Sequence, residues 1–139
     1  MSSLVVRPAT PRDAPAVLKL WRLASAVPTR TDNEESILAL IARDPDALLV
    51  AEQEGRLVGS LIAGFDGWRG TFFRLVVLPE QRRSGLGRTL VRAGEGSLKR
   101  RGAHRITLYA IKSEPAAADF WDAVGYEGDE HTSRYFKNL

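Results

Sequence analysis

Two patterns of hydrophobic spacing divide the chain into predicted helices and strands. In the first predicted helix, apolar residues recur at intervals of three and four: Val17, Leu18, Trp21 and Ala24. We expect this helix to begin at Thr10, where Asp13 completes a capping box. A second helix is predicted over residues 33–43, and we expect it to end there because Asp44 and Pro45 follow.

Short apolar or alternating runs between turn residues predict strands over residues 4–7, 47–52, 56–65, 71–78, 104–110 and 131–137. Two further helices are expected over residues 86–101 and 115–124. The element order is then β-α-α-β-β-β-α-β-α-β. This order predicts an α/β (α+β) fold with a mixed, mostly antiparallel sheet, in which one helical crossover makes the fourth and fifth strands parallel.

Residues 76–88 form the most informative segment of the chain. An apolar run ends at Pro79, a basic turn follows, and a Gly-x-Gly sequence opens a helix. The first N–H groups of a helix have no partner inside it, and the helix dipole adds about half a positive charge, so phosphate groups bind there. Glycine removes the Cβ atoms that would hold a diphosphate away from the backbone. The candidate binding residues are Val76, Val77, Arg82, Arg83, Gly85, Leu86, Gly87 and Arg88.

Two well-known phosphate loops do not match this segment. The nucleotide-triphosphate loop needs a lysine after its glycines, and none follows Gly87. The dinucleotide fingerprint needs a third glycine, and position 90 is Leu90. On the loop pattern alone, a basic surface turn before a helix is an equally good interpretation.

The segment resembles the acyl-CoA loop of the GNAT superfamily of N-acetyltransferases, Gln/Arg-x-x-Gly-x-Gly/Ala, which Arg82-x-x-Gly85-x-Gly87 matches in full. Residues 6–13 look like the opening strand and first helix start of that family. Residues 120–126, Phe-Trp-Asp-Ala-Val-Gly-Tyr, look like its aromatic-x-x-x-Gly-Phe/Tyr signature. Because the three landmarks stand in the family's order, residues 1–139 are identified as a single GNAT-like domain.

The resemblance implies helices on both faces of the sheet and an enzyme that moves the acetyl group of acetyl-CoA to an amine. The amine is expected to attack directly in a ternary complex, and it belongs to a small molecule or to a protein or peptide. In the family, the fourth and fifth strands splay apart around the pantetheine arm. This splaying would free backbone groups near residues 75–77 to pair with the pantetheine amides.

The sequence departs from the family at the catalytic acid. The usual tyrosine, four residues before the glycine of the signature, is replaced by Trp121, whose indole only donates hydrogen bonds and cannot act as a general acid. Tyr109 is the best remaining phenol and Glu114 the best-placed carboxylate. Each has a structural alternative: Tyr109 as a half-buried strand residue, and Glu114 as an N-terminal helix residue.

Three acidic residues, Asp32, Glu34 and Glu35, stand at the start of the second predicted helix. The helix dipole alone favours acids in a first turn. In the resembled family this segment borders the acceptor cleft, so the same carboxylates would attract a cationic amine. Both interpretations remain open in the sequence.

Composition limits the other possible functions. The 139 residues are 44% hydrophobic and 27% charged, as in ordinary globular proteins, and they include no cysteine. The two histidines, His104 and His131, lack metal-ligand spacing, so no metal is expected. No apolar run reaches the roughly 20 residues of a membrane span, and no signal-peptide pattern is present, so a cytoplasmic protein with no membrane partner is expected.

Two other functions remain as alternatives. The net charge of +3 allows binding of nucleic acid, but no aromatic residues interleave with the basic ones as a base-stacking surface requires. Trp121 in the tyrosine position favours a non-catalytic acyl-CoA-binding domain instead. The sequence leaves open whether the chain forms a homodimer.

Overall fold

In the computed structural model, which describes residues 3–139, five strands form one sheet in the order β1-β2-β3-β4-β5. The strands are β1 (Leu4–Pro8), β2 (Leu48–Gln53), β3 (Arg56–Phe65), β4 (Gly70–Val77) and β5 (Ile106–Leu108). The helices are η1 (Pro11–Asp13), α1 (Ala14–Leu23), α2 (Glu34–Arg43), η2 (Pro79–Gln81), α3 (Leu86–Arg100) and α4 (Pro115–Ala123), where η marks a short 3-10 helix. The chain divides into two compact units, which meet between Thr107 and Leu108 and are described separately.

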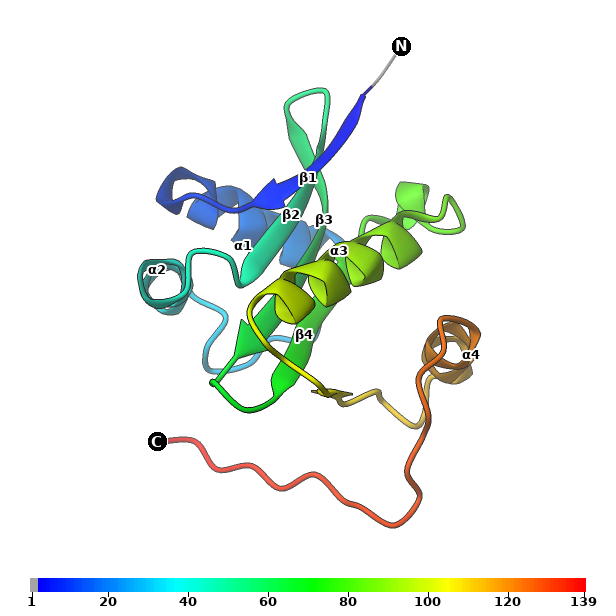
Figure 1. Ribbon diagram of the computed structural model, residues 1–139. Helices are drawn as coiled ribbons and strands as arrows, with labels where there is room; N and C mark the ends of the chain where they lie inside the picture. Colours follow the sequence, from blue (N-terminus) through cyan, green and yellow to red (C-terminus); the bar gives the residue numbers. More distant parts are fainter. Residues whose placement is uncertain (1–2) are drawn as a thin grey trace. The chain divides into compact units, whose positions relative to one another are not determined.

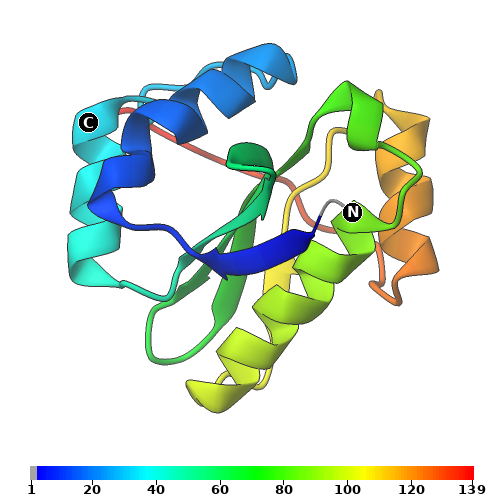
Figure 2. The same cartoon turned by 90° about the horizontal axis from the view of Figure 1, so that it is seen from above.

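In the first unit, β1 to β4 are antiparallel neighbours, with α1 and α2 on one face and α3 on the other (Figures 1 and 2). The side chains most deeply buried between these layers are Val17, Leu20, Leu48, Val50, Ser60, Leu61, Leu78, Leu90, Val91 and Leu98. The mixed, mostly antiparallel sheet predicted from the sequence is therefore confirmed.

The predicted helices are also present. Asn33 caps α2 by accepting a hydrogen bond from the Ser36 N–H at 2.7 Å. On α1 the buried stripe contains Val17, Trp21 and Ala24 as expected, but Leu20 is buried where Leu18 was predicted, and Leu18 is only half-buried.

The predicted strand over residues 131–137 is wrong. Residues 132–139 have no regular secondary structure, and every residue from 127 onward is exposed, Tyr135 to 93%. The strand predicted over residues 104–110 is limited to β5 (Ile106–Leu108). Aromatic residues in the last segment gave it strand propensity, but a strand also needs a neighbouring strand to take up its backbone hydrogen bonds.

Two glycines inside α3 have different structural roles. A Cβ atom on Gly94 would lie 2.7 Å from Cδ2 of Leu61 and 2.9 Å from Cε1 of Phe72. Gly94 therefore lets α3 pack closely on β3 and β4. A Cβ atom on Gly96 would meet only Nη1 of Arg100, at 3.3 Å, which is the end of a flexible side chain. Packing on the sheet does not require glycine at position 96.

We expect Gly94→Ala to lower the free energy of unfolding by about 1–3 kcal/mol, because the added methyl group overpacks the interface between α3 and the sheet. Gly96→Ala is the matched control. It should raise stability by up to about 1 kcal/mol, since alanine favours a helix interior. Urea unfolding of both variants measures the difference, and equal effects of the two substitutions would contradict the packing role of Gly94.

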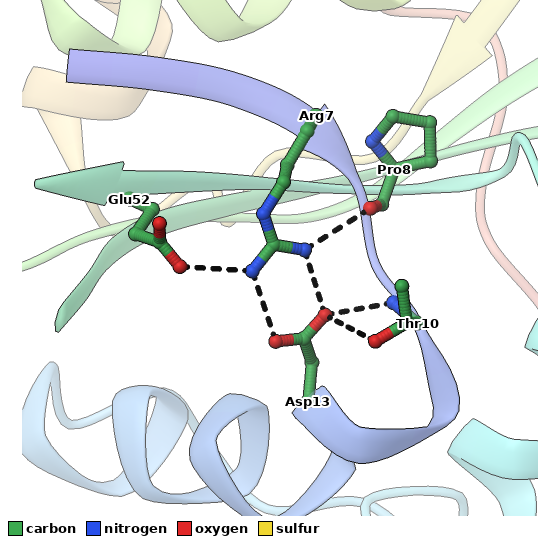
Figure 3. A network of polar contacts seen from close by, with 5 residues as sticks. All are labelled: Arg7, Pro8, Thr10, Asp13 and Glu52. Atoms are coloured by element: carbon green, nitrogen blue, oxygen red, sulfur yellow. Dashed lines mark hydrogen bonds and ion pairs between the residues drawn. The ribbon is translucent and has the colours of Figure 1, made fainter. Parts of the chain in front are cut away.

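A polar network joins β1, the start of α1 and β2 (Figure 3). The Arg7 guanidinium donates to Asp13 at 2.8 and 3.0 Å and to Glu52 at 2.9 Å. Asp13 also accepts the N–H of Thr10 at 2.7 Å, which is the contact predicted from the capping box. The hydrogen bonds from Arg7 are the main reason that the pKa of Asp13 falls from 3.8 to about 2.

The lowered pKa predicts how the stability of the protein depends on pH. The contribution of Asp13 is complete above the unfolded-state pKa and is lost as the pH falls through the folded-state pKa of about 2. We expect Asp13→Asn to lower the free energy of unfolding by about 1–2 kcal/mol at pH 7, and this difference should shrink between about pH 4 and pH 2. Urea unfolding across this range measures it. A difference that stayed constant down to the lowest pH would contradict the ion pair as its source.

Candidate functional site

The segment between β4 and α3 has a defined backbone path. After β4, the Leu78 N–H donates to the Val58 carbonyl at 3.0 Å, and the chain then turns through η2 (Pro79–Gln81). The Gln81 side chain donates to Gln53 at 2.8 Å and thereby ties the turn to β2. Gly85 caps α3 with φ of +87°, in the left-handed region that favours glycine. Glycine is therefore needed at position 85 for its backbone conformation.

The first turn of α3 presents free backbone donors. The Thr89 N–H donates to the Gly85 carbonyl at 3.0 Å and makes the first hydrogen bond of this helix, so the N–H groups of Leu86, Gly87 and Arg88 have no partner inside it. The Leu86 side chain is buried, and it would contact a Cβ atom on Gly59 at 3.2 Å. At position 86, then, the side chain anchors the helix to the sheet, and only the N–H group is available to a ligand.

Three arginines belong to this turn or to the first turn of α3, and one of them, Arg82, donates through Nη2 to the Ala24 carbonyl at 3.5 Å. Arg82, Arg83 and Arg88 are exposed, and none of them takes part in an ion pair within residues 3–139. The nearby carboxylate of Glu80 is held by Arg56 at 2.9 Å. Free backbone donors, the helix dipole and three unpaired positive charges thus favour an anion that carries several charges.

The C-terminal end of β4 is irregular. Ser60 pairs with Val76 and Ile62 with Phe73, so a single residue of β3, Leu61, lies opposite two residues of β4. This is a β-bulge at residues 74–75, and Arg74 adopts φ of +52° there.

The edge of β4 beyond the bulge is not paired with β5. Backbone groups point alternately to the two sides of a strand. Since the Leu78 N–H points to β3, the N–H and C=O of Val77 point to the other side. The Gly70 N–H donates to the Arg105 carbonyl at 2.8 Å, so β5 begins beside the start of β4. With three residues, β5 does not extend along β4 as far as Val77.

The sequence analysis missed a buried polar network behind the bulge. The indole N–H of Trp21 donates to the Ser60 hydroxyl at 2.9 Å, and this hydroxyl donates to the Arg74 carbonyl at 2.9 Å. The Arg74 guanidinium in turn forms an ion pair with Asp32. The only signals in the sequence were two polar residues, Ser60 and Arg74, inside strands that are otherwise largely apolar.

The two catalytic candidates belong to the second unit. Tyr109 follows β5 and is 56% exposed, so the interpretation of Tyr109 as a half-buried strand residue is wrong. Glu114 is exposed at the N-cap position of α4, and its side chain does not cap the helix. The Trp121 ring is half-buried, with the rings of Phe120 and Tyr126 edge-on to it at 5.0 and 5.1 Å.

Within residues 3–139, no group of three or more His, Cys, Asp or Glu residues is arranged to hold a metal ion. Of the helices in this range, none has the length and apolar character needed to cross a bilayer.

Comparison with known proteins identifies the family of the chain. The model of the acetyltransferase (GNAT) family matches residues 15–126. An acetyltransferase of Pectobacterium atrosepticum is 34% identical over 115 residues, which cover 83% of this chain and 82% of that protein.

Solved structures show the same fold. The PaiA N-acetyltransferase of Thermoplasma acidophilum, in complex with coenzyme A, aligns with a TM-score of 0.83 at 17% identity and covers 94% of this chain and 93% of that one. The aminoglycoside N-acetyltransferase AAC(6')-Iy, in complex with CoA, aligns with a TM-score of 0.75 at 18% identity and covers 100% of this chain and 97% of that one.

Proposed function

The chain belongs to the GNAT acetyltransferase family, the acetyl-CoA-dependent N-acetyltransferases, and on this premise we propose that residues 76–88 bind acetyl-CoA and that the acetyl group passes directly to an amine in a ternary complex. The proposal rests on the groups found at the start of α3. Three N–H groups there have no partner inside the helix, and three neighbouring arginines in the sequence, Arg82, Arg83 and Arg88, have no acidic partner within residues 3–139. The diphosphate of CoA carries the charge that such a site favours.

The two parts of the site would hold different parts of acetyl-CoA. The first turn of α3, with Arg82, Arg83 and Arg88, would hold the diphosphate. The free edge of β4 beside Val76 and Val77 would pair with the amides of the pantetheine arm, because the backbone groups of Val77 point away from β3. The C=O of Val77 would accept an amide N–H of that arm, which leaves the N–H of Val77 as the proposed donor to the oxygen of the thioester.

The chemistry is attack of a neutral amine on the thioester carbon. The nitrogen forms a C–N bond, the carbonyl oxygen becomes an oxyanion, and collapse of this intermediate breaks the C–S bond. The nitrogen loses one proton, and the departing thiolate gains one. We assign protonation of the thiolate to Tyr109 and removal of the amine proton to Glu114. A thiol ionises near pH 8.5, so the acid assists the reaction without being essential to it.

The acceptor is proposed to be an amine of a small molecule or of a protein or peptide. Both solved structures named above are N-acetyltransferases, and one of them is an aminoglycoside N-acetyltransferase. This makes aminoglycosides sensible first members of an acceptor panel. Trp121 in the position of the usual tyrosine favours a second candidate function, a domain that binds acyl-CoA without catalysis.

We expect Gly85→Glu and Gly87→Glu each to abolish binding of acetyl-CoA, measured by calorimetry, because both place a bulky negative group against the diphosphate. Gly67→Glu is the matched control: Gly67 also has a positive φ, of +94°, and a Cβ atom there would meet nothing within 4 Å. Its position in the turn between β3 and β4 is at the opposite end of β4 from the loop. Unchanged affinity in the position-85 and position-87 variants would refute the site.

Release of thiol from acetyl-CoA, measured with an amine panel, tests the activity itself. We expect at least one amine to be acetylated, and Tyr109→Phe to lower kcat by about tenfold or more if the phenol protonates the thiolate. A wild-type rate in Tyr109→Phe would exclude this role. Binding of acetyl-CoA without turnover on any amine would favour the non-catalytic alternative.

A further inference from the structure

Arg74 reaches from the bulge of β4 to the segment that connects α1 and α2. Its Nε donates to Oδ1 of Asp32 at 3.2 Å, and its Nη2 binds the other oxygen of the same carboxylate. The Nη2 also donates to the Val27 carbonyl at 2.7 Å. One guanidinium therefore fixes two points of this segment, five residues apart.

The backbone of Arg74 is held by a hydrogen bond as well as its guanidinium. Its carbonyl accepts the hydroxyl of Ser60, which is fully buried and which also accepts the indole N–H of Trp21. The guanidinium lies 5.4 Å from the centre of the Trp21 ring. The side chains of Arg74 and Asp32 are only 18% and 13% exposed, so solvent screens their charges weakly.

This clamp lies close to the proposed site of transfer. Arg74 precedes Val77 by three residues, which is about 10 Å along a strand. α3 covers one face of β3 and β4, and α1 covers the other (Figure 2). Trp21 of α1 donates to Ser60 of β3, so the clamp lies on the face of α1. An amine that approaches the end of β4 from this second face passes the segment that Arg74 holds.

The acidic residues near the clamp differ in whether they are paired. Asp32 is neutralised by Arg74 and cannot serve as a free anionic group for an amine. Glu34 and Glu35, in the first turn of α2, are exposed and form no ion pair within residues 3–139. Of these three acidic residues, Asp32 is the one that the clamp holds.

We propose that Arg74 is a positioning residue for the acceptor: through Asp32 and the Val27 carbonyl it holds residues 27–32 at the bulge of β4, beside the end of the strand where the amine attacks. This inference rests on the proposed function. In this inference, the Arg74–Asp32 pair contributes to the affinity for the acceptor, whereas the loop before α3 determines the affinity for acetyl-CoA.

The test compares Asp32→Asn with the double variant Arg74→Gly/Asp32→Asn. The double variant removes both charges, and glycine suits the positive φ at position 74, so the bulge is kept. We expect the KM for a cationic amine to rise by about tenfold in each variant, because residues 27–32 are then no longer held at the bulge beside the acceptor. The affinity for acetyl-CoA, measured by calorimetry, should stay at the wild-type value.

Asp44→Asn provides a matched control. Asp44 pairs with Arg101 at 2.8 Å, Arg101 also donates to the Ala63 carbonyl at 2.6 Å, and their side chains are 25% and 18% exposed. This is the same kind of clamp at the end of α2, away from the bulge. Asp44→Asn should lower the thermal midpoint as Asp32→Asn does, and leave the KM for the acceptor unchanged.

The outcomes separate the two proposals. If the wild-type protein acetylates an amine and the KM is unchanged in the Asp32 variants, or rises equally in Asp44→Asn, the role of Arg74 is refuted while the proposed function stands. If the wild-type protein binds acetyl-CoA but acetylates no amine, the proposed function fails, and the role of Arg74 fails with it.

Discussion

The close approach of α3 to β3 and β4 is the contact on which the rest of the first unit depends. It requires glycine at position 94, because Leu61 and Phe72 occupy the space that a Cβ atom would need. Leu86 and Leu90 continue the same contact at the start of the helix, over Gly59. The helix axis is fixed along its length as a result, and its first turn is held just after the end of β4. A loose helix would let the backbone donors of that turn move relative to the free edge of the strand.

On the other face of the sheet, the bulge of β4 organises the polar groups. A regular antiparallel strand would pair each residue of β4 with one residue of β3, and the side chain at position 74 would follow the ordinary alternation. The extra residue turns Arg74 toward α1, where Trp21 and Ser60 hold its base and Asp32 its tip. We therefore assign the two faces separate roles in the proposal, with the donor at the start of α3 and the acceptor beside the segment between α1 and α2.

The sequence predicted most of the helices and strands, because residues close together in the chain specify them. The capping box of Thr10 and Asp13, the helix end at Asp44 and the turn before α3 each arise from residues close together in the chain. The loop motif and the two flanking landmarks also identified the family, since spacing along the chain is enough for such motifs. The strand predicted over residues 131–137 failed for the opposite reason: its formation depends on a partner strand, which composition does not reveal.

The sequence by itself thus determined the fold class and the family, and it predicts anion binding at residues 76–88, because adjacent residues carry each of these signals. Only the tertiary structure decided what Asp32, Ser60, Arg74 and Gly94 do. Asp32 looked like an acid favoured by a helix dipole or free to meet an amine, and it is held by an arginine 42 residues later in the chain. Such pairings depend on where the sheet brings distant segments together, and the pattern of hydrophobic and polar residues along the chain does not record them.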